Sequence, residues 1–244
     1  MTDRLLDRQL KLLDYLTSSS AIFAGRRATR LDPVLRGLDR GLLRLEARFS
    51  YDKRMEKILS VFPKTFARLG AEERAIRQAF VDACPPIDIS RLANARQFYD
   101  FLCERWQHEG PDPAYLSDVA ACELACAQVR AAHAEGQEQG EGGELCGSHR
   151  RVRRRHDVVL LRCAHDVRPI FEDEAAQAMP VKRMTRVAVV PGAEDGEPAI
   201  CELSSGLFDL VAALDDWTDV AMLGDTAEAI VAQLRDHALV ELAR

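Results

Sequence analysis

The chain has 244 residues, of which 47% are hydrophobic and 30% are charged, and its formal net charge at pH 7 is −6. This composition is typical of a folded protein with one large domain or two small ones, and it excludes a disordered chain. The negative net charge also argues against nucleic-acid binding, which would have to come from a local basic patch.

The first residues carry charges every few positions, so they contain no apolar signal-peptide core. No window approaches the roughly 20 apolar residues that a membrane-spanning helix requires. Seven cysteines, an odd number, occur in this chain without a secretion signal, which indicates reduced thiols. We therefore expect a cytoplasmic protein without a membrane partner.

Residues 1–135 show helical periodicity. The segment after Asp32 and Pro33 predicts a long helix that ends at Pro63, because aspartate caps a helix and proline suits its first turn. A short helix closed by Gly70 follows, then two amphipathic helices separated by Pro85–Pro86, and a last helix over 114–134. An apolar stripe opens the chain at Leu5, Leu6, Leu10, Leu13 and Leu16. This part predicts an N-terminal helical bundle.

Residues 136–156 have no apolar period and predict a linker, rich first in glycine and glutamate and then in arginine. The basic run consists of Arg150, Arg151, Arg153, Arg154 and Arg155. Such a cluster can contact phosphate, but it contains no interleaved aromatic residues for base stacking. The favoured interpretation is a solvated loop; docking onto an acidic protein and nucleic-acid binding remain alternatives.

Residues 157–244 predict a small module that contains both strands and helices. The segment 157–165 is β-rich, and 185–203 predicts two strands joined by a glycine-bearing turn. Helices are expected over 204–216, capped by Ser204 or Ser205, and over 226–240, capped by Thr226. The predicted fold class is therefore α+β, mostly α.

The residues that could carry catalysis or hold a metal do not form a recognisable site in the sequence. Cys122 and Cys126 lie one helical turn apart, but His133 lies about 10 Å further along the axis, too far to share one ion. We expect the cysteines to pack in the core, with a two-thiolate copper site as the alternative. The histidines lie without acidic partners at a diagnostic spacing: His108, His149, His156, His165 and His237. We expect no catalytic residue and no metal site in this chain.

Several short motifs resemble those of a known family. They are the Phe62–Pro63, Leu69–Gly70 and Pro85–Pro86 pairs and a Y-L-x-D-x-A pattern from Tyr115 to Ala120. Residues 50–172 thereby resemble the helical domain of proteins once catalogued as putative DNA-binding partners of multinuclear non-haem iron oxygenases. The stretch "ARFSYDKRMEKI" is most similar to the MbnC-type partners of methanobactin biosynthesis.

This resemblance implies a non-catalytic subunit of a heterodimer with an iron-dependent oxygenase, in which the helical domain over 1–135 binds the partner. The partner would hold the iron, so this chain would need no cofactor. In the methanobactin case the complex oxidises a cysteine of a ribosomally made precursor peptide to an oxazolone with a neighbouring thioamide, using dioxygen.

Residues 185–242 are similar to the winged-helix element that recognises leader peptides, which implies a winged-helix-like domain of three strands and three helices over 157–244. In that family the leader adds a strand to an exposed sheet edge beside the third helix. The residues expected to bind it are Ala199, Ile200, Cys201, Glu202 and Leu203 of the edge strand and Ile230, Gln233 and Leu234 of the last helix. A proline at Cys201 is expected to remove a backbone donor from this edge.

Two other function classes remain open. A winged-helix DNA-binding regulator would use the arginine run as its phosphate contact, although the last helix carries one arginine against two acids in "TAEAIVAQLRDH". A copper-binding protein would use Cys122 and Cys126. We expect the peptide-binding subunit, with no nucleic-acid partner.

Overall fold

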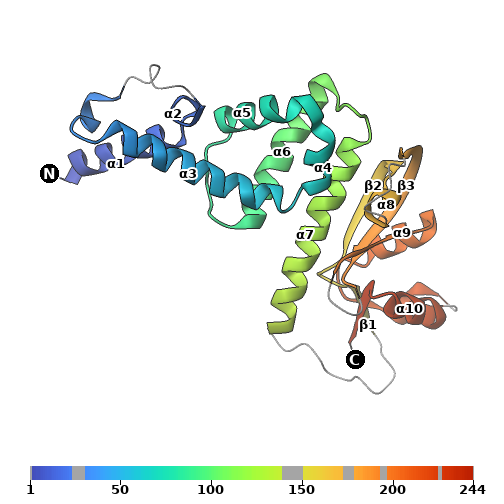
Figure 1. Ribbon diagram of the computed structural model, residues 1–244. Helices are drawn as coiled ribbons and strands as arrows, with labels where there is room; N and C mark the ends of the chain where they lie inside the picture. Colours follow the sequence, from blue (N-terminus) through green and yellow to red (C-terminus); the bar gives the residue numbers. More distant parts are fainter. Residues whose placement is uncertain are drawn as a thin grey trace. The chain divides into compact units, whose positions relative to one another are not determined.

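The computed structural model describes residues 2–23, 31–138, 151–172, 179–192, 197–224 and 227–243. These residues form two compact units, Met1–Asp112 and Pro113–Arg244. The first unit is helical, and the second combines helices with two antiparallel three-stranded sheets (Figure 1). The predicted fold class, α+β and mostly α, is confirmed.

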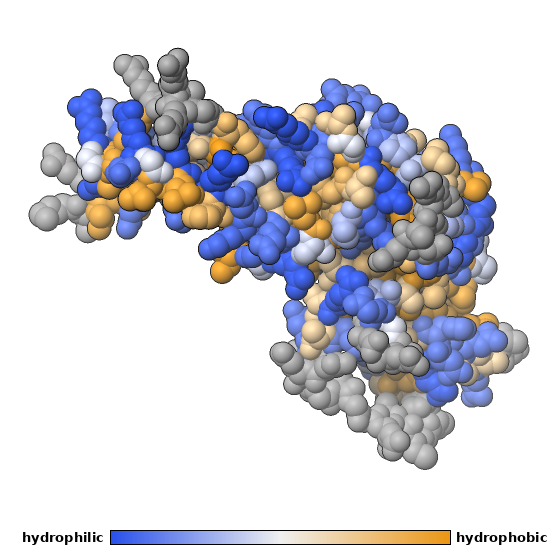
Figure 2. Space-filling view, viewed as in Figure 1, coloured by the Kyte–Doolittle hydropathy of each residue, from blue (hydrophilic) through white to orange (hydrophobic). Residues whose placement is uncertain are grey.

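The first unit is built from consecutive helices of different lengths (Figure 1). Several apolar side chains of its first helices are exposed, and Figure 2 shows such hydrophobic surface at the N-terminal end of the chain. Its elements are α1 (Thr2–Thr17), α2 (Ser19–Phe23), the 3₁₀ turn η1 (Pro33–Leu35), α3 (Arg40–Leu59), α4 (Pro63–Leu69), the 3₁₀ turn η2 (Gly70–Glu72), α5 (Glu73–Ala83) and α6 (Arg91–Glu109). The predicted breaks at Pro63, Gly70 and Pro85–Pro86 are confirmed. Gly70 has a φ of 54°, a left-handed backbone conformation that favours glycine.

The long helix α3 begins later than the sequence predicts. Asp32 does cap a helical turn, because its carboxylate accepts a hydrogen bond from the Val34 N–H at 2.9 Å, but that turn is η1 and ends at Leu35. Gly37 then takes a φ of 92°, and Asp39 provides a second cap through the Gly41 N–H at 2.7 Å. The first Asp-Pro signal is therefore genuine but belongs to a shorter element.

Phenylalanine rings from three helices of the first unit meet at Phe98 of α6. Its ring centroid lies 5.5 Å from Phe62, 5.2 Å from Phe66 and 5.1 Å from Phe80. Offset and edge-to-face contacts at these separations are favourable beyond the area that the rings bury. The Phe62–Pro63 motif thus starts α4 at Pro63 and places its phenylalanine in the core.

The second unit begins with a long helix and continues through the strands (Figure 1). Its elements are α7 (Leu116–Glu138), β1 (Arg151–Arg154), β2 (Val159–Asp166), α8 (Arg168–Glu172), β3 (Val181–Val190), β4 (Ala199–Glu202), α9 (Ser205–Ala213), β5 (Thr218–Asp219), the 3₁₀ turn η3 (Val220–Leu223), α10 (Ala227–Asp236) and β6 (Val240–Ala243). Residues 157–244 contain the predicted strands β2, β3 and β4 and the predicted helices α9 and α10. They also contain α8 and the strands β5 and β6, which form a second sheet with β1, so the expected three-strand domain is wrong in its number of strands. Ser204 caps α9 by accepting from the Leu207 N–H; Thr226 lies outside the described residues.

Helix α7 belongs with the strands, not with the helical bundle over 1–135 in which the sequence places it. It packs on β2 and β3, where Cys126 and Val129 share one apolar cluster with Val189. The opposite face of β3 contributes Ala188 and Val190 to a second cluster, which contains α9. Burial on both faces explains why β3 ends in a continuous apolar run.

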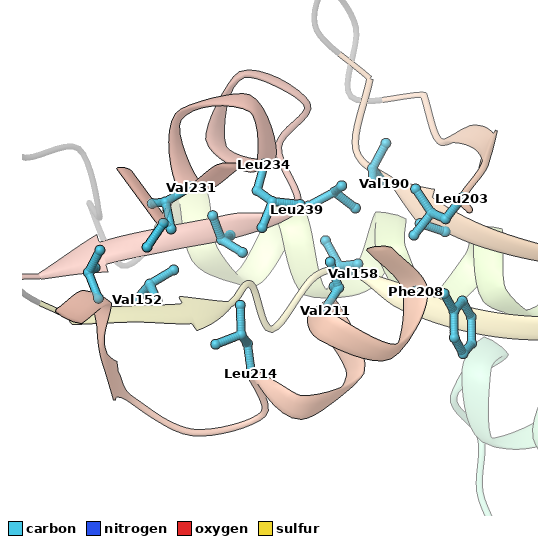
Figure 3. Packing of buried hydrophobic residues seen from close by; sticks show 14 residues of the cluster. Val152, Val158, Val190, Leu203, Phe208, Val211, Leu214, Val231, Leu234 and Leu239 are labelled. Atoms are coloured by element: carbon cyan, nitrogen blue, oxygen red, sulfur yellow. The ribbon is translucent and has the colours of Figure 1, made fainter. Parts of the chain in front are cut away.

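The arginine run forms a strand, so the predicted linker over 136–156 does not extend through it. Helix α7 continues to Glu138, residues 139–150 lie outside the described residues, and β1 then occupies Arg151–Arg154. β1 is the central strand of the sheet β5-β1-β6. Its Val152 points into an apolar core that also contains Leu214, Val231 and Leu234 (Figure 3).

Candidate peptide-binding edge

Strand β4 is the terminal strand of the sheet β2-β3-β4. It pairs with β3 from Val187↔Glu202 to Val190↔Ala199, and no other described strand pairs with its second side. A strand paired on one side leaves backbone N–H and C=O groups that can accept another extended chain. The structure thus places Ala199, Ile200, Cys201 and Glu202 on a sheet edge, as the sequence predicts.

The register of β4 determines which backbone groups point away from the sheet. The Leu203 N–H donates to the Arg186 carbonyl at 2.8 Å, so this opposed pair is hydrogen-bonded. Hydrogen-bonded pairs alternate along an antiparallel ladder, which makes Cys201 and Ala188 the next such pair. The backbone of Cys201 is therefore turned towards β3, and the outward groups belong to Ile200 and Glu202. A proline at Cys201 would break the sheet itself, contrary to the expectation from the sequence.

The side chains of this segment alternate between two environments. Ile200 packs beside the apolar clusters that α7 forms with the sheet, and Leu203 is buried in the cluster on the α9 side. Cys201 is exposed. Leu203 thus anchors the strand, whereas Cys201 and the outward backbone remain accessible.

An ion-pair network fixes the end of β4. The Glu202 carboxylate lies 2.7 Å from Arg183 of β3 and 2.6 Å from Arg168 of α8, and both arginines also contact Asp166 of β2. Hydrogen bonds from Arg168 hold the pKa of Asp166 well below its usual range, and those from Arg183 lower the pKa of Glu202. The two arginines and two carboxylates balance in charge, so this network holds the end of β4 in place without adding net charge to the edge.

The three residues predicted on α10 differ in accessibility. Gln233 is exposed and Ile230 is half-buried against the main core. Leu234 is only 1% exposed, and Figure 3 shows it inside the cluster with Leu239 and Val190. Leu234 therefore supports the helix from within, and a bound peptide could reach only Ile230 and Gln233 without unpacking the core.

The sequence pattern does not predict that part of β3 lacks a strand partner. β4 pairs with β3 from Val187 onward, so Val181–Thr185 has no strand partner on the β4 side among the described residues. Val181 and Met184 of this stretch are each 65% exposed, and Met179, two residues before it, is 74% exposed. Exposed apolar side chains beside unpaired backbone make this stretch of β3 a second place where an extended chain could pair with the sheet.

Two arginines of the basic run bond within the unit, and residues 151–154 form a strand, so the favoured interpretation of the run as a solvated loop is wrong. Arg153 binds Glu241, its cross-strand neighbour on β6, at 2.5 Å and stacks over Trp217 at 4.6 Å. Arg155 donates two hydrogen bonds, at 2.8 and 2.7 Å, to the buried carboxylate of Asp157. Oppositely charged residues directly across a ladder, such as Arg153 and Glu241, stabilise the strand pair, and Arg155 balances the buried charge of Asp157.

Two histidines have acidic partners that sequence spacing could not indicate. The carboxylate of Asp118 on α7 accepts from the backbone N–H groups of Ala164 and His165 and lies 2.8 Å from the His165 ring nitrogen Nδ1. His133 likewise lies 3.2 Å from Asp157. Asp118 is the aspartate of the Y-L-x-D-x-A motif, and it holds β2 where its register with β3 shifts.

The cysteines considered for copper lie in the protein interior. The buried Cys122 thiol is hydrogen-bonded to Cys163 of β2, and this bond together with burial raises its pKa. Burial raises the pKa of Cys126 to about 11. Thiolates are the metal-binding form, so both shifts oppose ligation by these residues. Within the described ranges, no three histidine, cysteine or acidic side chains gather in a group that could hold an ion.

None of the described helices combines the length and apolarity needed to cross a membrane. The sequence matches no protein-family model and no curated protein.

Proposed function

We propose that the protein is the non-catalytic, peptide-binding subunit of a complex with an iron-dependent oxygenase. The open edge of β4 carries this proposal. The leader of a ribosomally made precursor peptide would add to this edge as an extra strand, and the peptide's cysteines would reach the iron site of the partner.

The geometry of the edge supports strand addition. Outward backbone groups of Ile200 and Glu202 offer a donor and an acceptor at alternate positions. The exposed apolar side chains of Val181 and Met184 belong to β3, the strand that pairs with β4, and could contact the peptide's own apolar residues. Leu203 and the Glu202 ion pairs hold the strand in place, so binding would cost little ordering of the receptor.

The partner and its chemistry rest on the motif resemblance. A methanobactin-type oxidation of cysteine to an oxazolone and thioamide would take place at the partner's iron. The competing DNA-binding regulator has less support, because Arg153 and Arg155 already bind Glu241 and Asp157.

The strand-addition model predicts that Glu202→Pro loses most of the affinity for the precursor peptide. Proline removes the outward N–H and is tolerated where that group faces solvent. Glu202→Ala is the matched control, because it loses the same ion pairs but keeps the N–H. Calorimetry with the precursor that co-purifies from native cells should show weak binding for the proline variant and near-normal binding for the alanine variant.

Equal affinities for the two variants, both shown to be folded, would place the peptide elsewhere. A pull-down of the full chain from native cells tests the partner. Recovery of an iron-containing oxygenase supports the proposal, and its repeated absence alongside a captured DNA fragment would favour the regulator.

A further inference from the structure

A cavity of about 270 Å³ opens in the first unit, and all the residues that line it belong to that unit. It lies among α1, α2, α3, α5 and the segment that leads into α6. Its apolar lining includes Leu16, Ile22, Val81, Pro86 and Ile89. Cavities with mostly apolar walls and a few polar groups are typical sites for small molecules.

The charged residues of the cavity are mostly basic. Lys53, Arg54 and Lys57, all from α3, line it together with a single carboxylate, Asp88. Asp88 accepts a hydrogen bond from the Ser90 N–H at 2.7 Å, which fixes it in the turn before α6. The formal charge of this lining is therefore positive in a chain whose net charge is negative.

Arg54 is held rigidly by neutral groups. Its guanidinium donates to the Asn94 side-chain oxygen at 2.9 Å, the Gln97 side-chain oxygen at 2.6 Å and the Cys84 carbonyl at 2.8 Å. It also lies 4.4 Å from the centroid of the Phe80 ring. No carboxylate of the described residues forms an ion pair with it, and burial lowers its pKa. A positive charge without a counter-ion is thus fixed beside an apolar cavity.

The polar support of Arg54 is fully formed. Asn94 is 3% exposed, and its side-chain nitrogen donates to the Asp88 and Ser90 carbonyls at 2.9 and 2.7 Å. Lys57 donates to the Ile89 carbonyl. These bonds tie α3 to the segment before α6, so the cavity would not need to reorganise to receive a ligand.

We propose that this cavity binds a small amphiphilic carboxylate, with its hydrocarbon tail among Leu16, Ile22 and Val81 and its head group beside Lys53, Arg54 and Lys57. The Arg54 guanidinium uses one N–H of each terminal nitrogen in the hydrogen bonds to Cys84 and Gln97. The other N–H of each terminal nitrogen is left to bind a carboxylate. The tail replaces water on apolar walls, and the head group supplies the counter-charge that the site lacks. Ile89, 86% exposed at the rim, would gain an apolar contact.

Calorimetric titration of the full chain with octanoate tests the proposal, with octanol and octyl phosphate as comparison ligands. Octanoate should bind at one site, and octanol at least about tenfold more weakly, because it lacks the charge-assisted hydrogen bonds. Tighter binding of octyl phosphate than octanoate would overturn the assignment to a carboxylate and assign the site to a phosphate head group. Equal binding of octanol would contradict the role of the basic residues.

Two variants locate the binding site. Lys53→Met removes an exposed charge and should weaken octanoate binding by about tenfold with no loss of folding. Ser50→Trp places a large side chain at the exposed rim without removing a core contact, and it should abolish binding. Asp52→Asn, on the same helix but outside the lining, is the control. The proposal would be overturned if all three variants bound octanoate as the unmodified chain does, or if the unmodified chain did not bind it. A side chain of a partner protein would then be the expected occupant of the cavity.

Discussion

At the scale of single residues, Ala238 adopts a backbone conformation that suits glycine. Its φ is 55°, and it lies between α10 and β6, where its N–H donates to the Arg235 carbonyl. This left-handed conformation is unfavourable for a residue with a Cβ, and helices commonly end in it with glycine. We expect Ala238→Gly to raise the free energy of unfolding by about 0.5–1 kcal/mol. Urea denaturation should show a higher midpoint with an unchanged slope, and a lower midpoint would contradict this account.

Among the described residues of the second unit, Asp157 is the most deeply buried charged side chain, at 1% exposure. Burial alone would raise its pKa, but hydrogen bonds from Arg155 and His133 and the charge of Arg155 lower it. Because the folded pKa lies below the usual value of about 3.9, the ion pair contributes stability above that pH and loses it as the pH falls through the folded pKa.

Asp157→Asn should therefore lower the free energy of unfolding at pH 7 by about 2 kcal/mol. The difference in unfolding free energy between this variant and the unmodified protein should shrink as the pH falls towards and below the pKa of Asp157 in the folded state. Asp209→Asn is the control, because its pair with Arg162 is exposed and should contribute less than about 0.5 kcal/mol. Denaturation of the three proteins at several pH values measures both effects, and a difference that grows on acidification would contradict the prediction.

At the scale of elements, local signals predict most helices and the main strands. Proline at Pro63, glycine at Gly70 and the cap at Ser204 act within one turn, so the sequence shows them directly. The start of α3 was mispredicted because Asp32 and Asp39 both provide valid caps, and only the backbone at Gly37 decides between them. Such a choice depends on how the turn packs against its neighbours.

The strand formed by the arginines could not be predicted from local pattern. β1 reads as a charged run because only Val152 of its residues is buried, and the stabilising groups lie far along the chain. Arg153 bonds to Glu241 and stacks over Trp217, and β1 pairs with β5 and β6. Central position in a small sheet compensates for the poor β propensity of arginine, which is a tertiary effect.

The edge site was predicted in part. The location of β4 follows from an apolar segment after a glycine-bearing turn, but the direction of each backbone group depends on pairing with β3. A register shifted by one residue would have turned the Cys201 N–H outward. The burial of Leu234 is likewise a consequence of the core around Val190 and Leu239, which no pattern within α10 reveals.

At the scale of the whole molecule, the chain divides at 112/113, although its helical pattern continues through α7. Periodicity shows that α7 is a helix but not what it covers. Its buried residues, including Val119, Cys122 and Val129, contact strands that come later in the chain. The family-like motifs consequently fall into both units, with Phe62–Pro63 in the first and Asp118 in the second.

This division predicts how fragments of the protein fold. A fragment of residues 113–244 keeps α7 over Val187 and Val189 and keeps the Asp118 bonds to β2, so it should unfold cooperatively. A fragment of residues 139–244 lacks that cover, exposes one apolar face of β3 and should aggregate or show no sigmoidal transition. Circular dichroism during urea denaturation compares them, with 1–112 expected to unfold as a separate helical unit. Cooperative unfolding of 139–244 at the midpoint of the longer fragment would show that α7 is dispensable and would restore the boundary near residue 135.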